Sequence, residues 1–248
     1  MKKKLLTIFA LLVVMVALVV VSVMGTIAFM TASAAVSNTF TVGDVAIHMY
    51  ESKVTNKGQD RVADDPSING AMKDSDGNNY HLMPGLTYVK DPTIYVNANC
   101  DEAYLFVKVR NNISTIEATD APTIAQQLAA HGWQEFINTS TGMVYLYTGV
   151  NSDGTDLSGD DLTAIQNKTR EPKVVGGTAE MQSIDVFDSF KVATNADVKL
   201  YGGAKVTLTA FAIQADSFEN KDGKTAVQHA WDAIVAAYPY ENGTQISE

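Results

Sequence analysis

The sequence predicts a mainly β protein, an antiparallel β-sandwich with short helical insertions that follows an N-terminal signal helix. Three observations lead to this prediction. Several runs rich in β-branched and aromatic residues alternate with a period of two, as half-buried strands do. The two segments with a helical period lie between or beside these runs without a βαβ rhythm, which argues against a parallel sheet. The chain also begins with the layout of an export signal.

The N-terminal segment is a run of apolar residues behind a basic start. Residues 2–4 are lysines, residues 5–24 carry no charge, and small residues follow. Two sites have the small-x-small pattern that precedes signal cleavage, one ending at Ala28 and the other at Ala34. An uncleaved membrane anchor is the alternative interpretation, because about 20 apolar residues can span a bilayer.

The charge balance limits the classes of partner. The formal net charge is −10, and without the three N-terminal lysines the chain carries 15 basic against 28 acidic residues, a charge of −13. Such a surface repels phosphate backbones and anionic lipid, so nucleic acid is not an expected partner, and a membrane is expected only through the apolar segment. Cys100 is the single cysteine, so the chain has no internal disulfide.

Four runs have the period expected of strands, namely residues 38–52, 92–98, 103–110 and 205–215. Gly43 interrupts the first run, where a bulge or a tight bend would sit. The third run is expected to be a half-buried strand, and its two faces are Leu105, Val107 and Val109 against Tyr104, Phe106 and Lys108.

Two segments have a helical period. In residues 122–131, Pro122 stands at the expected first helical position and Gly132 provides the stop. Residues 225–238 form the second helix, and its apolar stripe consists of Val227, Trp231, Ile234, Val235 and Tyr238.

The remaining segments are less regular. Residues 133–150 predict a hairpin whose five-residue turn is 138–142. Residues 183–193 fit a strand or a helix equally well. Two stretches rich in Asp, Asn and Gly, at 53–80 and 151–180, are expected to be excursions outside the core.

Four short motifs, taken in order, resemble the TasA/camelysin family of exported bacterial proteins. They are Gly25-Thr26-Ile27-Ala28, the strand Ser37 to Gly43, the turn Leu82-Met83-Pro84-Gly85 with the following Lys90-Asp91-Pro92, and the strand Val206 to Ala215. The resemblance implies a jelly-roll-like β-sandwich, removal of the signal by a dedicated signal peptidase, and assembly into extracellular fibres of the biofilm matrix. It also favours the cut after Ala28.

The implied layout is a signal peptide at residues 1–28, an N-terminal arm at 29–37 and one β-sandwich domain at 38–248. Family assembly resembles donor-strand exchange, in which the N-terminal segment of one subunit completes the sheet of the next. The arm residues expected to do this are Phe29, Met30, Thr31, Ala32, Ser33, Ala34, Ala35 and Val36. The segment lacks the acidic residues expected just after the cut, and a disordered leader remnant is the alternative interpretation.

Because camelysins have been described as surface metalloproteases, the resemblance also implies a metalloprotease as an alternative. The chain has four histidines and no His-Glu-x-x-His motif, and no two of the histidines have helical spacing. A zinc site that joins His48 and His81 with Glu51 or Asp91 stays open. No catalytic residue is therefore assigned.

The sequence predicts no cofactor, although two oxygen-rich segments are candidates for binding calcium. Their carboxylate and amide residues alternate around a glycine, as in the first part of a cation loop, and are Asp74, Asp76 and Asn78 in one segment and Asp153 and Asp156 in the other. Neither has the downstream glutamate of an EF-hand, and ordinary turns have the same composition.

The expected function is therefore that of a secreted, non-enzymatic bacterial protein of the Gram-positive type, located at the cell surface or in the matrix. Its expected partners are other copies of itself, the signal peptidase during export, and a second matrix or surface protein. The alternatives are a camelysin-type metalloprotease and a monomeric binding module of the cell surface.

Overall fold

The structure is a computed structural model that describes residues 31–35, 38–39, 41–42, 45–61, 78–149 and 173–238. Its strands form antiparallel sheets and its α-helices are two, so the predicted mainly β, antiparallel fold is confirmed for this part of the chain. The predicted signal helix at 1–28 lies outside the described residues. Within them, neither helix has the length and apolar character to cross a bilayer.

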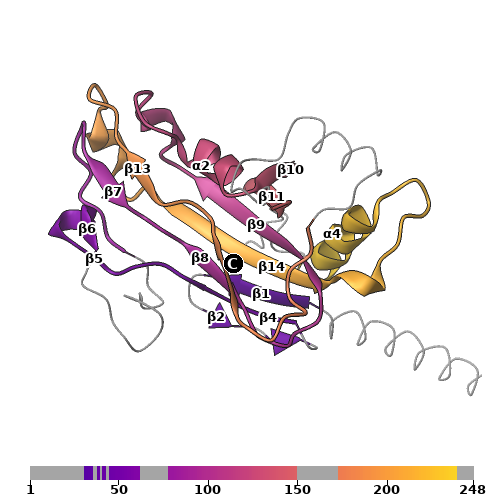
Figure 1. The fold of residues 1–248 in the computed structure, drawn as a ribbon. Helices are drawn as coiled ribbons and strands as arrows, with labels where there is room; N and C mark the ends of the chain where they lie inside the picture. Colours follow the sequence, from indigo (N-terminus) through magenta and orange to yellow (C-terminus); the bar gives the residue numbers. More distant parts are fainter. Residues whose placement is uncertain are drawn as a thin grey trace, which may run out of the picture.

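The larger sheet has six strands in the order β10-β11-β9-β14-β1-β2 (Figure 1). Every neighbouring pair in it is antiparallel. The strands are β10 (Trp133–Thr139), β11 (Gly142–Tyr147), β9 (Ala103–Asn111), β14 (Val206–Gln214), β1 (Thr31–Ala35) and β2 (Asn38–Thr39).

A second sheet has four strands in the order β12-β8-β4-β3, which are β12 (Gln182–Asp185), β8 (Thr93–Val96), β4 (Val45–Tyr50) and β3 (Thr41–Val42). Two small pairs complete the strands: β13 (Ser189–Lys191) with β7 (Thr87–Val89), and β5 (Val54–Thr55) with β6 (Asp60–Arg61). Residues 183–193, which fitted either element, therefore contain parts of two strands. Single 3-10 turns lie at Asn56–Gly58, Ser114–Ile116, Val198–Tyr201 and Ala215–Ser217.

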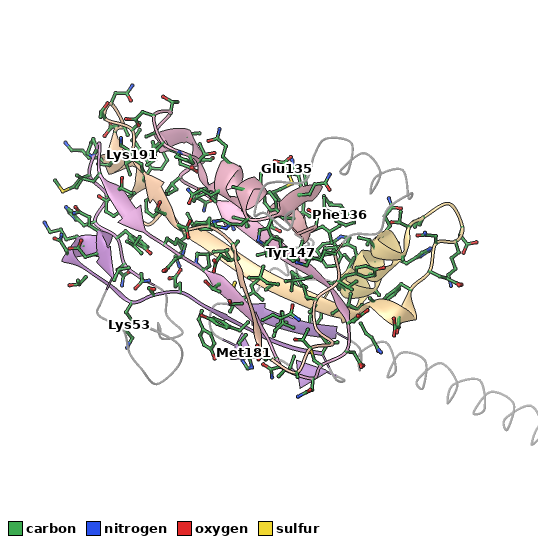
Figure 2. The ribbon with its side chains drawn as sticks, in the orientation of Figure 1. Lys53, Glu135, Phe136, Tyr147, Met181 and Lys191 are labelled. Carbon is green, nitrogen blue, oxygen red and sulfur yellow. The ribbon has the colours of Figure 1, made fainter. Side chains whose placement is uncertain are left out.

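The main core contains side chains of both larger sheets. Ile47 on β4 and Ile94 on β8 belong to one buried cluster with Leu105 on β9 and Leu208 on β14. Figure 2 shows the labelled Tyr147, 8% exposed, in the interior, whereas Met181, 44% exposed, lies at the outer edge. Burial of this apolar surface is the main stabilising contribution to the fold.

A second core lies on the other face of the larger sheet, beneath helix α4 (Ala226–Ala237). There the rings of Phe106 and Trp231 are 5.2 Å apart between centroids. Strand β9 is consequently buried along both faces, and the expectation of a half-buried strand was wrong. Alternation correctly separated the two faces, but it did not show that a helix covers the second one.

Both helices begin with a capping box. In α2 (Ile124–Ala130) the Thr123 hydroxyl accepts from the Gln126 backbone N–H, while the Gln126 side chain accepts from the Thr123 N–H. Thr225 and Gln228 do the same for α4. Thr123 and not a proline therefore sets the start of α2, so the placement of Pro122 inside the helix was wrong by two positions. The predicted end of the helix at Gly132 was correct, because Gly132 directly follows the C-cap residue His131.

The β10–β11 hairpin is tighter than expected. Thr139 pairs with Gly142, which leaves two connecting residues in place of the predicted five-residue turn. The Thr139 hydroxyl donates to the Gly142 carbonyl at 2.6 Å and supports this closure. The strands thus continue into the stretch whose polar composition indicated a turn.

The described ends of the 53–80 excursion are attached to the core. Residues 54–61 form the short β5–β6 pair, and the Tyr80 ring packs edge-on against Tyr88 and Phe190, with centroids 6.0 Å and 5.4 Å away. The expectation that this stretch lies wholly outside the core was therefore wrong at its C-terminal end.

Candidate assembly interface

Strand β14 forms the middle of the larger sheet and has a partner on each edge. All nine of its residues pair with β9, from Val206 opposite Asn111 to Gln214 opposite Ala103. Its sequence, Val-Thr-Leu-Thr-Ala-Phe-Ala-Ile-Gln, combines β-branched, small and aromatic residues, which suits a strand that packs on both faces. Figure 1 shows β14 and β9 side by side along the length of the molecule.

The other edge of β14 pairs with the predicted N-terminal arm. Five residues of β1 take part, from Thr31 opposite Ile213 to Ala35 opposite Thr209. Five of the eight arm residues, Thr31, Ala32, Ser33, Ala34 and Ala35, are thus in a strand, whereas Phe29, Met30 and Val36 lie outside the described residues. Within this chain the arm folds back onto its own sheet.

On its other edge, β1 pairs with a neighbouring strand over only two residues. Only Ala34 and Ala35 pair with β2, opposite Thr39 and Asn38, so two residues connect the two strands. The ladder to β14 is therefore the longer of the two attachments of β1. A strand held mainly along one edge can be replaced by an equivalent strand that offers the same backbone groups.

The part of β14 that β1 covers is buried. Ala210 and Ala212 are 0% exposed and belong to the main core, whereas Phe211 and Ile213 are 1% exposed and belong to the core beneath α4. Without a strand at this position, the backbone N–H and C=O groups of residues 209–213 that point towards β1 would lose their partners. An apolar strand with an unpaired edge recruits another strand, from its own chain or from a neighbour.

The histidines are spread over the described residues. His48 stacks on Tyr50, His131 lies 3.2 Å from the Asp188 carboxylate, and His229 Nε2 lies 3.0 Å from the Lys221 carbonyl. Among the described residues no group of three or more His, Cys, Asp or Glu side chains is placed to hold a metal ion. Within the described residues, the structure therefore does not bring together the histidines and carboxylates of the zinc site suggested by the sequence.

The carboxylates of that zinc set have protein partners. Glu51, 3% exposed, accepts from Lys90 Nζ at 2.6 Å and from Asn78 Nδ2 at 3.0 Å. Both carboxylate oxygens of Asp91 accept from Ser52, at 2.9 Å and 2.8 Å. These groups tie β4 to the segment after the excursion, a structural role that sequence analysis missed.

Of the calcium candidates, only Asn78 lies among the described residues. Its side-chain oxygen accepts from the Val54 backbone N–H at 3.2 Å, and its amide nitrogen also donates to the Ser52 carbonyl at 2.8 Å. Asp74, Asp76, Asp153 and Asp156 lie outside the described residues. Here Asn78 acts as a bridge between backbone segments.

Tyr80, beside this cluster, has the largest pKa shift that the described residues show. Burial, and next the negative charge of Glu51, raise its pKa well above the usual range. The neutral phenol donates to the Val89 carbonyl at 2.9 Å. It therefore acts as a buried hydrogen-bond donor that holds the chain before β7 against that strand.

Comparison with family models, with curated proteins and with solved structures gives no match for this chain. The TasA/camelysin resemblance therefore continues to rest on the four sequence motifs alone.

Proposed function

We propose that this chain is a secreted structural protein that polymerises into extracellular or surface fibres by lending its N-terminal strand to a neighbouring copy. Cleavage after Ala28 by the signal peptidase would free residues 29–37 as the donor. The observation that carries the proposal is the five-residue pairing of β1 with the edge of β14. A jelly-roll-like sandwich, with a core shared by the two sheets, is the proposed form of the subunit.

The physical basis is that the same ladder can form within a chain or between chains. A neighbour's arm would bring identical backbone groups to residues 209–213 of β14. Exchange of an identical element is a low-cost route to association, and a head-to-tail exchange that does not close propagates as a filament. For the arm to leave, its five pairs with β14 and its two pairs with β2 must break.

The competition between the two forms sets the conditions for assembly. A strand joined to its acceptor by a short linker has an effective concentration in the millimolar range, which favours the closed monomer in dilute solution. Fibre growth therefore requires high local concentration or a growing end that captures freed arms. Secretion into a confined matrix supplies the first condition.

Electron microscopy and light scattering of the processed protein test the proposal. We expect filaments from the chain that begins at Phe29 and only monomers from a chain that begins at Asn38, because the second lacks the donor strand. Filaments formed equally well by the shorter chain would exclude the arm as the donor. Monomers from both chains at millimolar concentration would reject self-assembly.

A further inference from the structure

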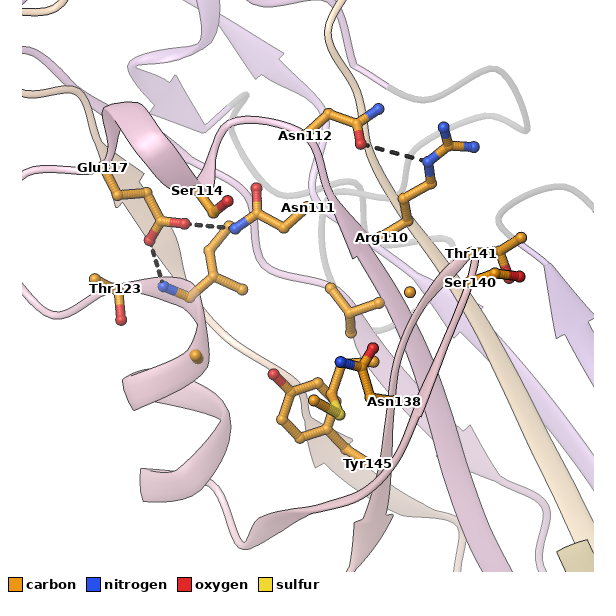
Figure 3. Close-up of a pocket in the computed structure, with 15 residues that line it drawn as sticks. Arg110, Asn111, Asn112, Ser114, Glu117, Thr123, Asn138, Ser140, Thr141 and Tyr145 are labelled. Carbon is orange, nitrogen blue, oxygen red and sulfur yellow. Dashed lines mark hydrogen bonds between the residues drawn. The ribbon is translucent and has the colours of Figure 1, made fainter. Parts of the chain in front are cut away.

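A cavity of about 550 Å³ opens at one end of the larger sheet, between α2, the segment after β9 and the β10–β11 hairpin (Figure 3). Its size falls within the range of about 300–1,000 Å³ that is usual for small-molecule sites. The polar residues that line it include Asn111, Ser114, Glu117, Thr123, Asn138 and Tyr145. It lies away from the β1–β14 interface and has no part in the assembly argument.

The cavity is not built for an anion. Among the described residues, Arg110 is the only cationic one in the lining, but it alternates with Val109 and Asn111 along β9, so its side chain leaves the opposite face of the strand. Figure 3 shows Arg110 directed towards Asn112, with 3.4 Å between Nε and Oδ1. An anionic ligand would find no opposing charge in this space.

The cavity is not built for a cation either. The one carboxylate that the described residues place in the lining belongs to Glu117, and both oxygens accept protein hydrogen bonds, from Asn111 Nδ2 at 2.5 Å and from the Ile124 backbone N–H at 2.7 Å. Asn111 in turn accepts from the Ile113 N–H at 3.0 Å. Glu117 and Asn111 therefore hold the wall of the cavity and fix the start of α2 against β9.

The floor of the cavity carries an unused hydrogen-bonding group. Tyr145 is 6% exposed and lines the cavity, and its hydroxyl makes no hydrogen bond with the described residues. Burial first, and then the charges of Glu135 and Glu117, raise the pKa of Tyr145 to about 12. The phenol thus stays protonated and can both donate and accept. No buried side-chain nitrogen or oxygen of the described residues lacks a partner, so the Tyr145 hydroxyl reaches the open space of the cavity and is accessible to a ligand there.

The rim adds further groups without partners. The amide of Asn138 and the hydroxyl of Ser114 are exposed, line the same cavity and make no hydrogen bond within the described part of the chain. Met143 supplies an apolar patch beside them. Neutral donors and acceptors around a small apolar patch suit a molecule that carries many hydroxyl groups on a carbon ring.

We propose that this cavity binds an uncharged sugar unit, a hexose or an N-acetylhexosamine of a surface or matrix polysaccharide. Tyr145 anchors one sugar hydroxyl in the floor, and Asn138 and Ser114 bind others at the rim. The open side of the cavity lets the polysaccharide chain continue on either side of the bound unit. The protein would then hold polysaccharide through a site that is separate from any contact between its own copies.

Ligand-observed NMR with the full chain tests this site. The chain is kept in solution by a detergent without sugar, and the probes are trisaccharides of glucose, galactose and N-acetylglucosamine. We expect at least one trisaccharide to bind, with Tyr145→Phe and Asn138→Ala each weakening it about 3- to 10-fold through the loss of one hydrogen bond. Tyr147→Phe is the matched control: it makes the same change two residues along β11, at a residue 8% exposed that does not line the cavity.

Three results would overturn the proposal: no binding of any probe, binding that both cavity variants leave unchanged, or a preference for phosphate or glucuronate over the neutral sugars. Filament formation by the same variants, scored by electron microscopy, separates this site from the assembly proposal. Loss of sugar binding with normal filaments is the expected combination for Tyr145→Phe.

Discussion

At the scale of single residues, Gly132 shows how a helix stop depends on its surroundings. Gly132 and Gly203 both have φ of +82°, but a Cβ at Gly132 would lie 2.6 Å from the Gly149 backbone, whereas nothing lies within 4 Å of one at Gly203. Gly203→Ala should cost about 1–2 kcal/mol of unfolding free energy, because only the left-handed conformation is strained. Gly132→Ala should cost about 1–3 kcal/mol more, because backbone atoms must move. Urea unfolding of both variants gives the comparison, and equal costs would contradict it.

The buried ion pair of Glu51 and Lys90 predicts a large effect of a single substitution. Lys90→Met leaves a carboxylate that is 3% exposed without its cation, which should lower the unfolding free energy by about 3–5 kcal/mol. Lys224→Met, which breaks the exposed pair with Asp232, should cost at most about 1 kcal/mol. Adding Glu51→Gln to Lys90→Met should recover part of the loss. If the two lysine variants have equal denaturation midpoints, the burial argument fails.

Glu117 predicts a pH dependence of stability. Burial, the largest cause, raises its pKa above the ordinary 4.5, although hydrogen bonds from Ile124 and Asn111 oppose the shift. The folded state therefore binds this proton more tightly than the unfolded state. The stabilisation is complete below pH 4.5 and is lost as the pH rises through the raised pKa. Compared with Glu117→Gln, the parent protein should lose unfolding free energy across this interval, measured by urea unfolding. Curves of unfolding free energy against pH that run parallel for the two proteins would contradict the raised pKa of Glu117.

Sequence reasoning at the residue scale succeeded where a pattern was local. Alternation placed Leu105, Val107 and Val109 on one face of β9, and these residues do lie together in the main core. It did not predict that Phe106 is covered, because Trp231 stands more than a hundred positions away in the chain. The cavity around Tyr145 was missed for the same reason, since its lining comes from several separate segments.

At the scale of elements, strand β1 is the part whose removal should have a defined and reversible effect. A chain beginning at Asn38 loses the partner of residues 209–213, so it should be less stable than the chain beginning at Phe29. A synthetic peptide of residues 29–37 should bind the shortened chain and raise its melting temperature, because it restores the ladder. A peptide with the same composition in scrambled order is the control.

The outcome that would contradict this prediction is an unchanged melting temperature on adding the native peptide, or an equal increase with the scrambled one. Because the β1 ladder lies between residues 31 and 35, the effect should not require the full arm. A five-residue peptide with that sequence should act in the same direction and more weakly.

The positions of the elements were largely predictable, and their ends were not. Period and β-branched content indicated the strands at 92–98, 103–110 and 205–215, and the observed strands differ from these by a few residues. The capping boxes at Thr123 and Thr225 could have been read from the Thr-x-x-Gln pattern, which would have corrected the start of α2. The length of the hairpin turn was mispredicted because Asn138 and Thr139, whose polar side chains indicated a turn, belong to strand β10 and are partly exposed to solvent.

At the scale of the whole molecule, the order of the strands was beyond what the sequence could show. The larger sheet joins residues 31–35 to residues 209–213, a pairing that no local pattern encodes. The sequence did indicate the fold class, because antiparallel sheets need only alternation and short connections. The central claim, that β1 leaves its own sheet for a neighbour's, concerns two molecules and requires a measurement on two molecules.

Disulfide trapping between differently marked chains tests that claim most directly. In a Cys100→Ala background, one chain carries Ala35→Cys and the other Thr209→Cys, two positions directly opposite in the β1–β14 ladder. The account predicts that a concentrated, assembled mixture gives disulfide-linked dimers that contain one chain of each kind. A chain with both substitutions, oxidised while dilute, should close on itself and stop forming filaments. No mixed dimers at any concentration, with the doubly substituted chain always closed internally, would contradict strand exchange.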